Sequence, residues 1–434
     1  IDALETFGGL SPAVVTKITD KGVRVHTTSG EDVQIEGEGL ALVSRVLHDT
    51  KVGEKLKIKV GSIVRVMKEG ESWKITQLPQ VESAFVSLDP KNGAVRALVG
   101  GFDFNRNKFN HVTQAWRQPG SSFKPFIYSA ALEKGFTPAS IIDDAPISFP
   151  ASFTGSGSSW EPHNFDGKYE GPMRLRTALT KSKNMVSIRV LNSIGVEYAQ
   201  DYITRFGFAA KDHPAYLTMA LGAGSVTPWQ MAQAYAVFAN GGYRVDPYLI
   251  GRIEDNKGKI IEETKFVEAG NDAERVIDAR NAFLMTSMMQ DVTRIGTAAK
   301  ARQLGRSDLA GKTGTTNNHI DTWFAGFNPK KVAVVWMGYD KPQSLGGTET
   351  GGSAALPIWI KYMSSALKGI PDVDLAPPEG VSSIRINLKS GNRAREDESG
   401  FYEYFYQEYP PPEKGGASGA ASAASDATDT DSLY

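Results

Sequence analysis

The sequence predicts an α+β protein, in which helices pack on an antiparallel sheet, preceded by a small all-β Greek-key barrel. Three observations lead to this prediction. Short alternating apolar and polar runs fill residues 11–80, apolar residues recur every three or four positions between residues 114 and 300, and strand-like runs return at 308–340. The chain has 434 residues, 41% of them hydrophobic, which is enough to bury the cores of two domains.

The predicted barrel occupies residues 11–80 and follows a linker at 1–10. Its alternating runs are AVVTKI, GVRVHT, EDVQIE, LKIKV, SIVRVMKE and SWKITQL. Five or so strands with a short helical connection near LALVSRVL are typical of an oligonucleotide/oligosaccharide-binding (OB) barrel. Acidic and basic residues are balanced and no aromatic ladder interrupts the strands, which argues against nucleic-acid binding. We therefore expect a spacer, or a module that docks a protein partner.

The second predicted domain spans residues 81–370. It opens with two β runs, ESAFVSLDP and AVRALVGG, joined across Asn92-Gly93, a dipeptide that favours tight hairpins. A meander of LAGKTGTT, TWFAGF and KVAVVWMGY follows the helical region, and it must share one sheet with the hairpin, since each alone would leave an apolar face in water. The helical runs are SFKPFIYSAALEKG, LRTALTKS, MVSIRVLNSIG, TPWQMAQAYAVFANGG and AERVIDARNAFLMTSMMQDV.

The remaining segments carry weaker signals. Residues 371–410 are predicted to form a C-terminal extension, and 411–434 a disordered tail, because the tail lacks apolar residues that would offset the entropy of ordering. The Gly-rich and Ser-rich segments 154–159 and 346–352 are expected to be surface loops. The sequence contains no apolar run of the roughly 18 to 20 residues that a membrane span needs, and we expect a piece of a longer protein.

Composition excludes several kinds of chemistry. The formal net charge of −1 gives no overall field that would attract nucleic acid or an anionic membrane. With 0 cysteines there is neither a thiolate nucleophile nor a cysteine metal site, and the 6 histidines lack metal-ligand spacing. A Gly-x-Ser-x-Gly elbow is missing, which argues against Ser-His-Asp hydrolysis. We expect no metal and no cofactor.

Three short segments in a fixed order carry the candidate chemistry: Ser121-Ser-Phe-Lys124, Ser182-Lys-Asn184 and Lys312-Thr-Gly-Thr315. A serine with a lysine one helical turn away, a polar turn and a lysine on a strand are the parts needed to acylate a serine without histidine. Ser121 follows the turn at Pro119-Gly120 and begins a helical run, where backbone N–H groups can stabilise developing negative charge.

Each motif has a decoy in the same chain. A second Ser-x-x-Lys occurs at Ser365-Ala-Leu-Lys368, while Lys389-Ser-Gly391 and Ser390-Gly-Asn392 imitate the other two motifs. Serine and asparagine at the start of a helix also commonly serve as caps. The order of the three segments, with their helix, turn and strand settings, nevertheless predicts a serine acyltransferase.

The sequence around the motifs resembles the transpeptidase half of class A penicillin-binding proteins, of the 1a type. The resemblance covers about 81–370 and is carried by RQPGSSFKPF, WEPHNFDGKYEGPMRLRTALTKSKN, LGAGSVTPWQMAQAYAVFANGG and AGKTGTTNN followed by DTWFAGF, and residues 11–80 resemble that subgroup's inserted module. It implies the penicillin-binding/serine β-lactamase-like fold and a D,D-transpeptidase that cross-links peptidoglycan stem peptides ending in D-Ala-D-Ala and is acylated by β-lactams. It also implies a periplasmic location, with a membrane anchor and a glycosyltransferase half outside this chain.

The resemblance assigns roles to the matching residues. Ser121 is the expected nucleophile and Lys124 its base, because burial and the charge of Lys312 favour a neutral Lys124 amine. Ser182 would relay a proton between the two lysines and the leaving amine. The backbone N–H groups of Ser121 and Thr315 would form the oxyanion hole. Lys312 would help to bind the terminal carboxylate, and the substrate-binding residues would be Asn184, Thr313, Gly314 and Thr315.

Three alternatives stay open. A class A β-lactamase carries a water-activating glutamate in a Glu-x-x-Leu-Asn segment between the second and third motifs, and this sequence has none there; Glu161-Pro-His-Asn164 precedes Ser182 and lacks the leucine. A D,D-carboxypeptidase would differ only in using water as the acceptor. A β-lactam sensor or scaffold of the same fold would be acylated without cross-linking.

Overall fold

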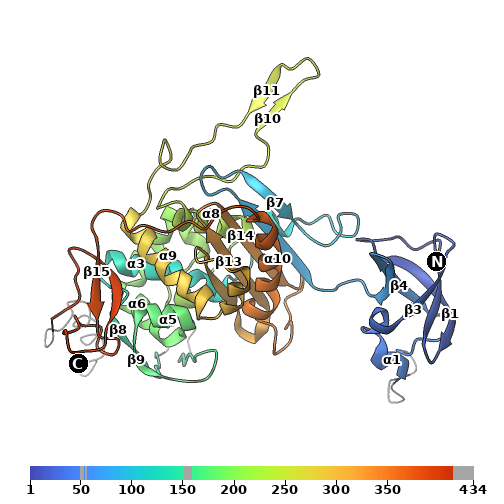
Figure 1. Ribbon diagram of the computed structural model, residues 1–434, viewed down its shortest axis with the longest axis horizontal. Helices are drawn as coiled ribbons and strands as arrows, with labels where there is room; N and C mark the ends of the chain where they lie inside the picture. The colour runs from blue at the N-terminus through green and yellow to red at the C-terminus, as the bar shows by residue number, and fades with distance from the viewer. Residues whose placement is uncertain (49–52, 54–55, 151–158, 414–434) are drawn as a thin grey trace. The chain divides into compact units, whose positions relative to one another are not determined.

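The structure is a computed structural model that describes residues 1–48, 53, 56–150 and 159–413 (Figure 1). The chain divides into two units, the first comprising 1–82 with 101–109 and the second 83–100 with 110–434. The loop predicted at 154–159 lies outside the described residues except for Ser159, as does the predicted tail beyond residue 413. Among the described residues, no helix is long and apolar enough to cross a membrane.

The first unit is a five-stranded antiparallel sheet in the order β3-β2-β1-β4-β5. One face of each strand is buried, as the alternation of apolar residues predicts. Its elements are β1 (Ser11–Thr19), β2 (Gly22–Thr27), β3 (Asp32–Glu36), η1 (Gly37–Leu40), α1 (Ser44–His48), β4 (Ile63–Glu69) and β5 (Ser72–Thr76). Helix α1 confirms the helix predicted near LALVSRVL.

The two edge strands of this sheet meet at η1. A Cβ atom on Gly39 of η1 would lie 2.4 Å from the carbonyl oxygen of Trp73 in β5 and 2.8 Å from the side chain of Ile35 in β3. The strand predicted at LKIKV is wrong, because Leu56 and Val60 are exposed and the chain turns. In that turn the N–H of Gly61 donates to the carbonyl of Val15 in β1.

The second unit is built on a five-stranded sheet in the order β12-β13-β14-β6-β7, which confirms that the hairpin and the meander share one sheet. The β6–β7 connection is wider than the tight turn predicted at Asn92-Gly93. The N–H of Asp89 pairs with the carbonyl of Ala94, and only Gly93 has a positive φ, of 79°. The strands are β6 (Glu82–Leu88), β7 (Val95–Val99), β12 (Ala310–Thr315), β13 (Asp321–Asn328) and β14 (Lys331–Gly338).

Helices cover both faces of this sheet (Figure 1). Alternate residues of β13 point to opposite faces. The ring of Phe327 lies 6.3 Å from Tyr235 of α8 (Pro228–Ala239), whereas Phe324 lies 5.0 Å from Trp359 of α10 (Leu356–Ala366). The sheet is therefore the middle layer of three, and its strands are almost completely buried.

The helical part contains the runs predicted from periodicity. Helix α9 begins at Ala279, six residues later than the run AERVIDARNAFLMTSMMQDV suggested, because Val276 and Ile277 pair with Gly242 and Asp278 caps the helix. The helices are α2 (His111–Gln114), α3 (Lys124–Glu133), α5 (Leu175–Lys181), α6 (Asn184–Ile194), α7 (Val196–Ile203) and α9 (Ala279–Arg294).

Three short antiparallel ribbons complete the second unit. They are β8 (Ile141–Asp144) with β9 (Gly171–Arg174), β10 (Arg252–Glu254) with β11 (Ile260–Glu263), and β15 (Val381–Ile386) with β16 (Phe401–Tyr406). The last ribbon lies within the predicted extension at 371–410 and docks on α9, where the rings of Phe283 and Tyr404 are 4.9 Å apart. Short helical turns join these elements: η2 (Gly120–Phe123), η3 (Thr204–Phe206), η4 (Ala210–Asp212), η5 (Leu217–Leu221), η6 (Ala299–Leu304), η7 (Asn317–His319) and η8 (Gly351–Ala355).

Candidate active site

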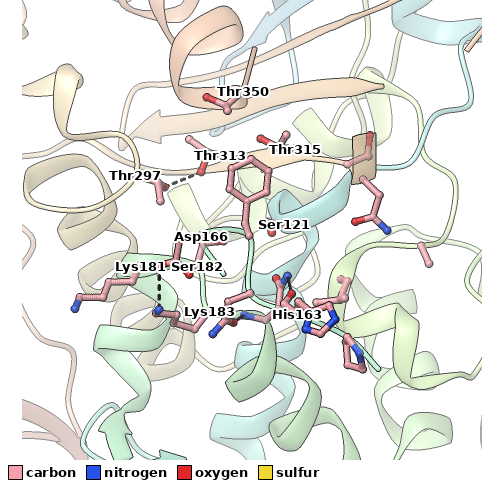
Figure 2. A pocket seen from close by; sticks show the side chains of 18 of the residues that line it. Ser121, His163, Asp166, Lys181, Ser182, Lys183, Thr297, Thr313, Thr315 and Thr350 are labelled. Atoms are coloured by element: carbon pink, nitrogen blue, oxygen red, sulfur yellow. Dashed lines mark hydrogen bonds and ion pairs between the residues drawn. The ribbon is translucent and has the colours of Figure 1, made fainter. Parts of the chain in front are cut away.

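The three sequence motifs converge on one cleft of about 810 Å³ (Figure 2). Ser121 lies in η2, the turn that leads directly into α3 at Lys124. Ser182-Lys-Asn184 joins α5 to α6, and Lys312-Thr-Gly-Thr315 belongs to β12. Lys124 and Lys312 are fully buried beneath the cleft, and Gly314 packs behind it against Pro119. The predicted site residues that line the cleft are Ser121, Ser182, Asn184, Thr313 and Thr315.

A rigid turn presents Ser121 to the cleft. The Ser122 hydroxyl donates to the Pro119 carbonyl at 2.7 Å, and the Tyr235 hydroxyl donates to the Ser122 carbonyl at 2.6 Å. Pro125 follows in the first turn of α3, where its missing N–H is not needed. Within the part of the chain that the structure describes, the Ser121 hydroxyl makes no hydrogen bond and caps no helix. It is therefore free to react.

Gly120 brings the Ser121 turn against the end of β12. Its φ is +56°, and a Cβ atom there would lie 2.9 Å from the carbonyl oxygen of Thr315 and 3.3 Å from its nitrogen. The backbone of Thr315 thus lies beside the turn that carries Ser121. An oxyanion hole made from the backbone N–H groups of Ser121 and Thr315 requires this proximity. Only glycine allows this approach without strain.

Gly120→Ala is expected to slow acylation of the protein by roughly 100-fold, the cost of misplacing one oxyanion-hole donor. The new methyl group would push against Thr315. Gly305→Ala is the matched control, because Gly305 has a similar φ of +65° but no atom within 4 Å of its added Cβ. Both variants should lose about 1–2 kcal/mol of stability from backbone strain. Thermal unfolding and penicillin acylation rates check this, and equal acylation of the two variants would contradict it.

Lys124 is held below Ser182 by three acceptors. Its Nζ donates to the Ser182 carbonyl at 2.7 Å, to Asn184 Oδ1 at 2.8 Å and, more weakly, to Ser182 Oγ at 3.3 Å. Burial lowers the pKa of Lys124 well below its ordinary value and the charge of Lys312 lowers it further, while the Asp144 carboxylate opposes both. The lowered pKa favours the neutral amine, which is the form that a general base needs.

Lys312 approaches the same hydroxyl from β12. Its Nζ donates to Ser182 Oγ at 2.8 Å and to the Thr313 carbonyl at 3.1 Å. Burial lowers the pKa of Lys312 to about 7. Ser182 thus connects two buried amines through a single hydroxyl, which is the arrangement a proton relay needs.

The backbone at Ser182 is unusual. Its φ is +60° and ψ +40°, a left-handed conformation that is rare outside glycine. The next residue, Lys183, has its ammonium 3.0 Å from Glu170, 3.1 Å from Asp166 and 3.3 Å from Asp144. Burial opposes this charge, but hydrogen bonds to Glu170 and Asp166 raise the pKa of Lys183 overall. The buried ammonium anchors the turn.

Asn164 caps α6 in place of the motif residues. Its Oδ1 accepts from the N–H groups of Asn184 at 2.8 Å and Met185 at 3.2 Å. The Asn184 amide is thereby left to accept from Lys124 and to donate to the His163 carbonyl at 2.8 Å. The alternative interpretation, that the Ser182 or Asn184 side chain caps the start of α6, is wrong. Ser182 instead ends α5, with its backbone N–H directed to the carbonyls of that helix.

A wall rich in hydroxyl groups faces Ser182 across the cleft (Figure 2). Thr297 Oγ1 lies 2.6 Å from Thr313 Oγ1, and Thr350 lines the same wall. Gly351 is buried and donates its N–H to Thr315 Oγ1 at 3.1 Å, so the surface loop expected at 346–352 is wrong at this residue. Thr297, Thr350 and Gly351 belong to no motif, and the sequence alone therefore does not identify them.

Residues 160–166 form the other wall, and they include Glu161-Pro-His-Asn164, the segment that only partly resembles the β-lactamase Glu-x-x-Leu-Asn. Glu161 lines the cleft, although the sequence placed it before the second motif. The ring of Phe165 lies 5.4 Å from that of His319, in an edge-to-face contact. Among the described residues, no group of three or more His, Cys, Asp or Glu side chains could hold a metal ion.

Comparisons with known proteins agree with this geometry. The family model of the penicillin binding protein transpeptidase domain matches residues 83–364, and that of the penicillin-binding protein OB-like domain matches residues 1–81. Penicillin-binding protein 1A of Neisseria flavescens is 50% identical over 381 residues, 88% of this chain and 48% of its own length. The protein of the same name from Pseudomonas aeruginosa is 41% identical over 459 residues, 94% of this chain and 56% of its own.

Solved structures give the same answer. The crystal structure of penicillin-binding protein 1A from Haemophilus influenzae is similar with a TM-score of 0.87 and 35% identity, over 94% of this chain and 64% of that one. The PonA1 protein from Mycobacterium tuberculosis in complex with penicillin V gives a TM-score of 0.59 and 26% identity, over 77% and 85%. This chain spans about half the length of the curated relatives that it matches. It belongs to the penicillin-binding proteins, and along the chain an OB-like domain is followed by the transpeptidase domain of this family.

Proposed function

We propose that this chain is a D,D-transpeptidase that cross-links peptidoglycan stem peptides through an ester on Ser121. The observation that carries the proposal is the juxtaposition of an unengaged Ser121 hydroxyl with Lys124, Ser182 and Lys312, whose two amines are buried and have lowered pKa values. A neutral amine beside a serine hydroxyl is the means by which a serine becomes a nucleophile without histidine.

In the first half of the reaction, Ser121 Oγ attacks the carbonyl carbon between the two D-alanines of a donor stem. Lys124 accepts the hydroxyl proton, and the backbone N–H groups of Ser121 and Thr315 stabilise the oxyanion. The C–N bond then breaks, and Ser182 passes a proton to the nitrogen of the departing D-alanine. The Thr313 and Thr315 hydroxyls, with Lys312 below them, bind the D-alanine carboxylate.

In the second half, an amine of a neighbouring stem attacks the ester carbonyl. A new amide forms, Ser121 regains its proton, and the stems are cross-linked. A β-lactam would enter as a donor analogue whose amide nitrogen stays tethered after ring opening, so that the ester persists. The relation to PonA1, which was solved with penicillin V, supports this part of the proposal.

A D,D-carboxypeptidase is the second candidate, and Glu161 favours it. Its carboxylate lines the cleft and, among the residues described, has no cationic partner, so it could activate water against the ester. The deciding experiment incubates the protein with a synthetic stem peptide ending in D-Ala-D-Ala and increasing concentrations of an amine acceptor. We expect amide product to replace hydrolysed product as the amine increases. Hydrolysis alone at every concentration would establish the carboxypeptidase, and no D-alanine release would refute both.

The rate of acylation is expected to rise with pH through the neutral range. Lys124 must be neutral to accept the Ser121 proton, and below its pKa it is protonated, so the rate falls as the pH falls. Because burial and Lys312 lower the pKa of Lys124, and burial lowers that of Lys312 to about 7, the rate should level off well below pH 10.5. Acylation by a fluorescent penicillin between about pH 5 and 10 measures this. A rise centred near 10.5 would contradict it.

The same proposal places the protein on the periplasmic side of the inner membrane, where its cross-linking substrate lies. Fractionation of cells that express the full-length protein, probed with an impermeant penicillin, tests this location. Labelling only after cell lysis would contradict it. Binding of a protein partner by the OB-like unit remains a prediction.

A further inference from the structure

The ribbon of β15 and β16 contributes one fully buried charge to the second unit. It lies beyond the residues that the transpeptidase family model matches, 83–364. Glu403 in β16 is 0% exposed, and its carboxylate accepts from Arg176 Nε at 2.7 Å and from Arg176 Nη2 at 2.5 Å. A buried carboxylate is tolerated only with such a partner, and a two-pronged contact fixes the orientation of both side chains.

Arg176 joins the ribbon to two helices at once. It lies in α5, and its remaining donors reach α9, at the Ser287 carbonyl (2.9 Å), Ser287 Oγ (3.0 Å) and Asp291 (3.2 Å). All five N–H donors of the guanidinium therefore have an acceptor. The contact between β16 and α5 spans 227 residues of sequence.

Helix α5 is the element that carries Ser182. It has only seven residues, too few to be stable without tertiary contacts, and it ends directly at the left-handed Ser182. A residue in such a conformation keeps it only where its surroundings impose it. At this same C-terminal end, α5 contacts the loop after α9, where the Thr297 N–H donates to the Thr180 carbonyl at 3.3 Å.

We propose that Glu403 is a positioning residue for the active site. By fixing Arg176 it sets the position of α5, and thereby holds Ser182 between Lys124 and Lys312. Figure 1 shows the ribbon, in red, at one edge of the helical part, and β16 contacts α9 through Tyr404 and α5 through Arg176. This inference rests on the proposed function. It makes the C-terminal ribbon part of the catalytic domain, although it contributes no residue to the cleft.

The test compares Glu403→Gln with Glu408→Gln. Glutamine keeps the shape of Glu403 but replaces one acceptor oxygen by a donor that faces Arg176. Glu408 follows β16 and pairs with Arg280 at the start of α9, at 2.7 and 2.9 Å. Its variant therefore weakens the attachment of the same ribbon to α9 and leaves the contact with α5 intact. The second-order rate constant for acylation by a fluorescent penicillin is measured per folded molecule between about pH 5 and 10.

Glu403→Gln is expected to lower the rate constant about tenfold, or about 1.4 kcal/mol. The rise of rate with pH should also move by about half a pH unit or more, because Ser182 no longer accepts from Lys312 in the same geometry. Glu408→Gln should stay within about twofold of wild type, with an unchanged pH profile, whatever its loss of thermal stability.

Three results would overturn the inference. They are a folded Glu403→Gln that acylates like wild type at every pH, equal slowing in both variants, and a loss of thermal stability without any change in rate. If Glu403→Gln does not fold, Arg176→Lys replaces it, because lysine keeps the charge but lacks the planar fork. Slow acylation of that variant supports the inference and wild-type acylation overturns it. A wild-type protein that no penicillin acylates overturns the proposed function, and this inference with it.

Discussion

Ser121→Ala is expected to abolish acylation by penicillin, lowering the rate by a factor of at least about 10⁴. The reason is that, in the proposed mechanism, the Ser121 hydroxyl supplies the oxygen of the ester, and alanine has no atom that can form this bond. The backbone N–H groups and the buried lysines remain in place, so the variant should still fold and bind penicillin non-covalently. Intact mass after penicillin treatment checks the result.

Ser365→Ala is the matched control for this variant. Ser365 and Lys368 repeat the Ser-x-x-Lys spacing, but Ser365 is exposed on α10, outside the residues that line the cleft. Its acylation rate should equal that of wild type. A mass shift that persists in Ser121→Ala, or one that disappears in Ser365→Ala, would show that the nucleophile has been misidentified.

Lys124→Ala should lower the acylation rate by about 10² to 10⁴, the range that a positioned base contributes. Lys124 is buried and donates to Ser182 and Asn184, so part of any loss could be structural. Lys124→Arg separates the two roles. Arginine keeps the positive charge and can donate hydrogen bonds, but it does not become neutral in proteins.

Both Lys124 variants are therefore expected to be slow, and Lys368→Ala to match wild type. The measurement is the rate of labelling by a fluorescent penicillin, with thermal unfolding to confirm the fold. Near-normal labelling of Lys124→Arg would mean that Lys124 acts through its charge. The base would then have to be Lys312, whose pKa is also lowered.

Local patterns in the sequence sufficed for most of the fold. The alternation in β1 to β5 and the three-and-four spacing in α6 each reflect one buried face, which a short window of sequence reveals. Helix α3 is apolar because it is buried on nearly all sides. The strand predicted at LKIKV failed because Leu56 and Val60 are exposed where the chain turns. The early start predicted for α9 failed because Gly242, far away in sequence, pairs with Val276 and Ile277.

The candidate site also has a part that the sequence predicts and a part that it does not. Ser121, Ser182, Asn184 and Lys312 could be proposed from motifs, and the structure brings them to one cleft. The residues that hold these side chains in place could not be predicted, because each acts through a contact between segments that are distant in the sequence. Asn164 caps α6 from 20 residues away, and Glu403 reaches Arg176 across 227 residues. Thr297 and Gly351 belong to no motif, and only packing against β12 reveals them.

The most direct test of the central claim is to treat the protein with penicillin, digest it, and locate the adduct by tandem mass spectrometry. We predict a single adduct, with the mass of one intact penicillin, on the Ser121 hydroxyl. An adduct on Ser182 or Ser365, or no adduct under conditions in which the folded protein is stable, would contradict the assignment of Ser121 as the acylated nucleophile.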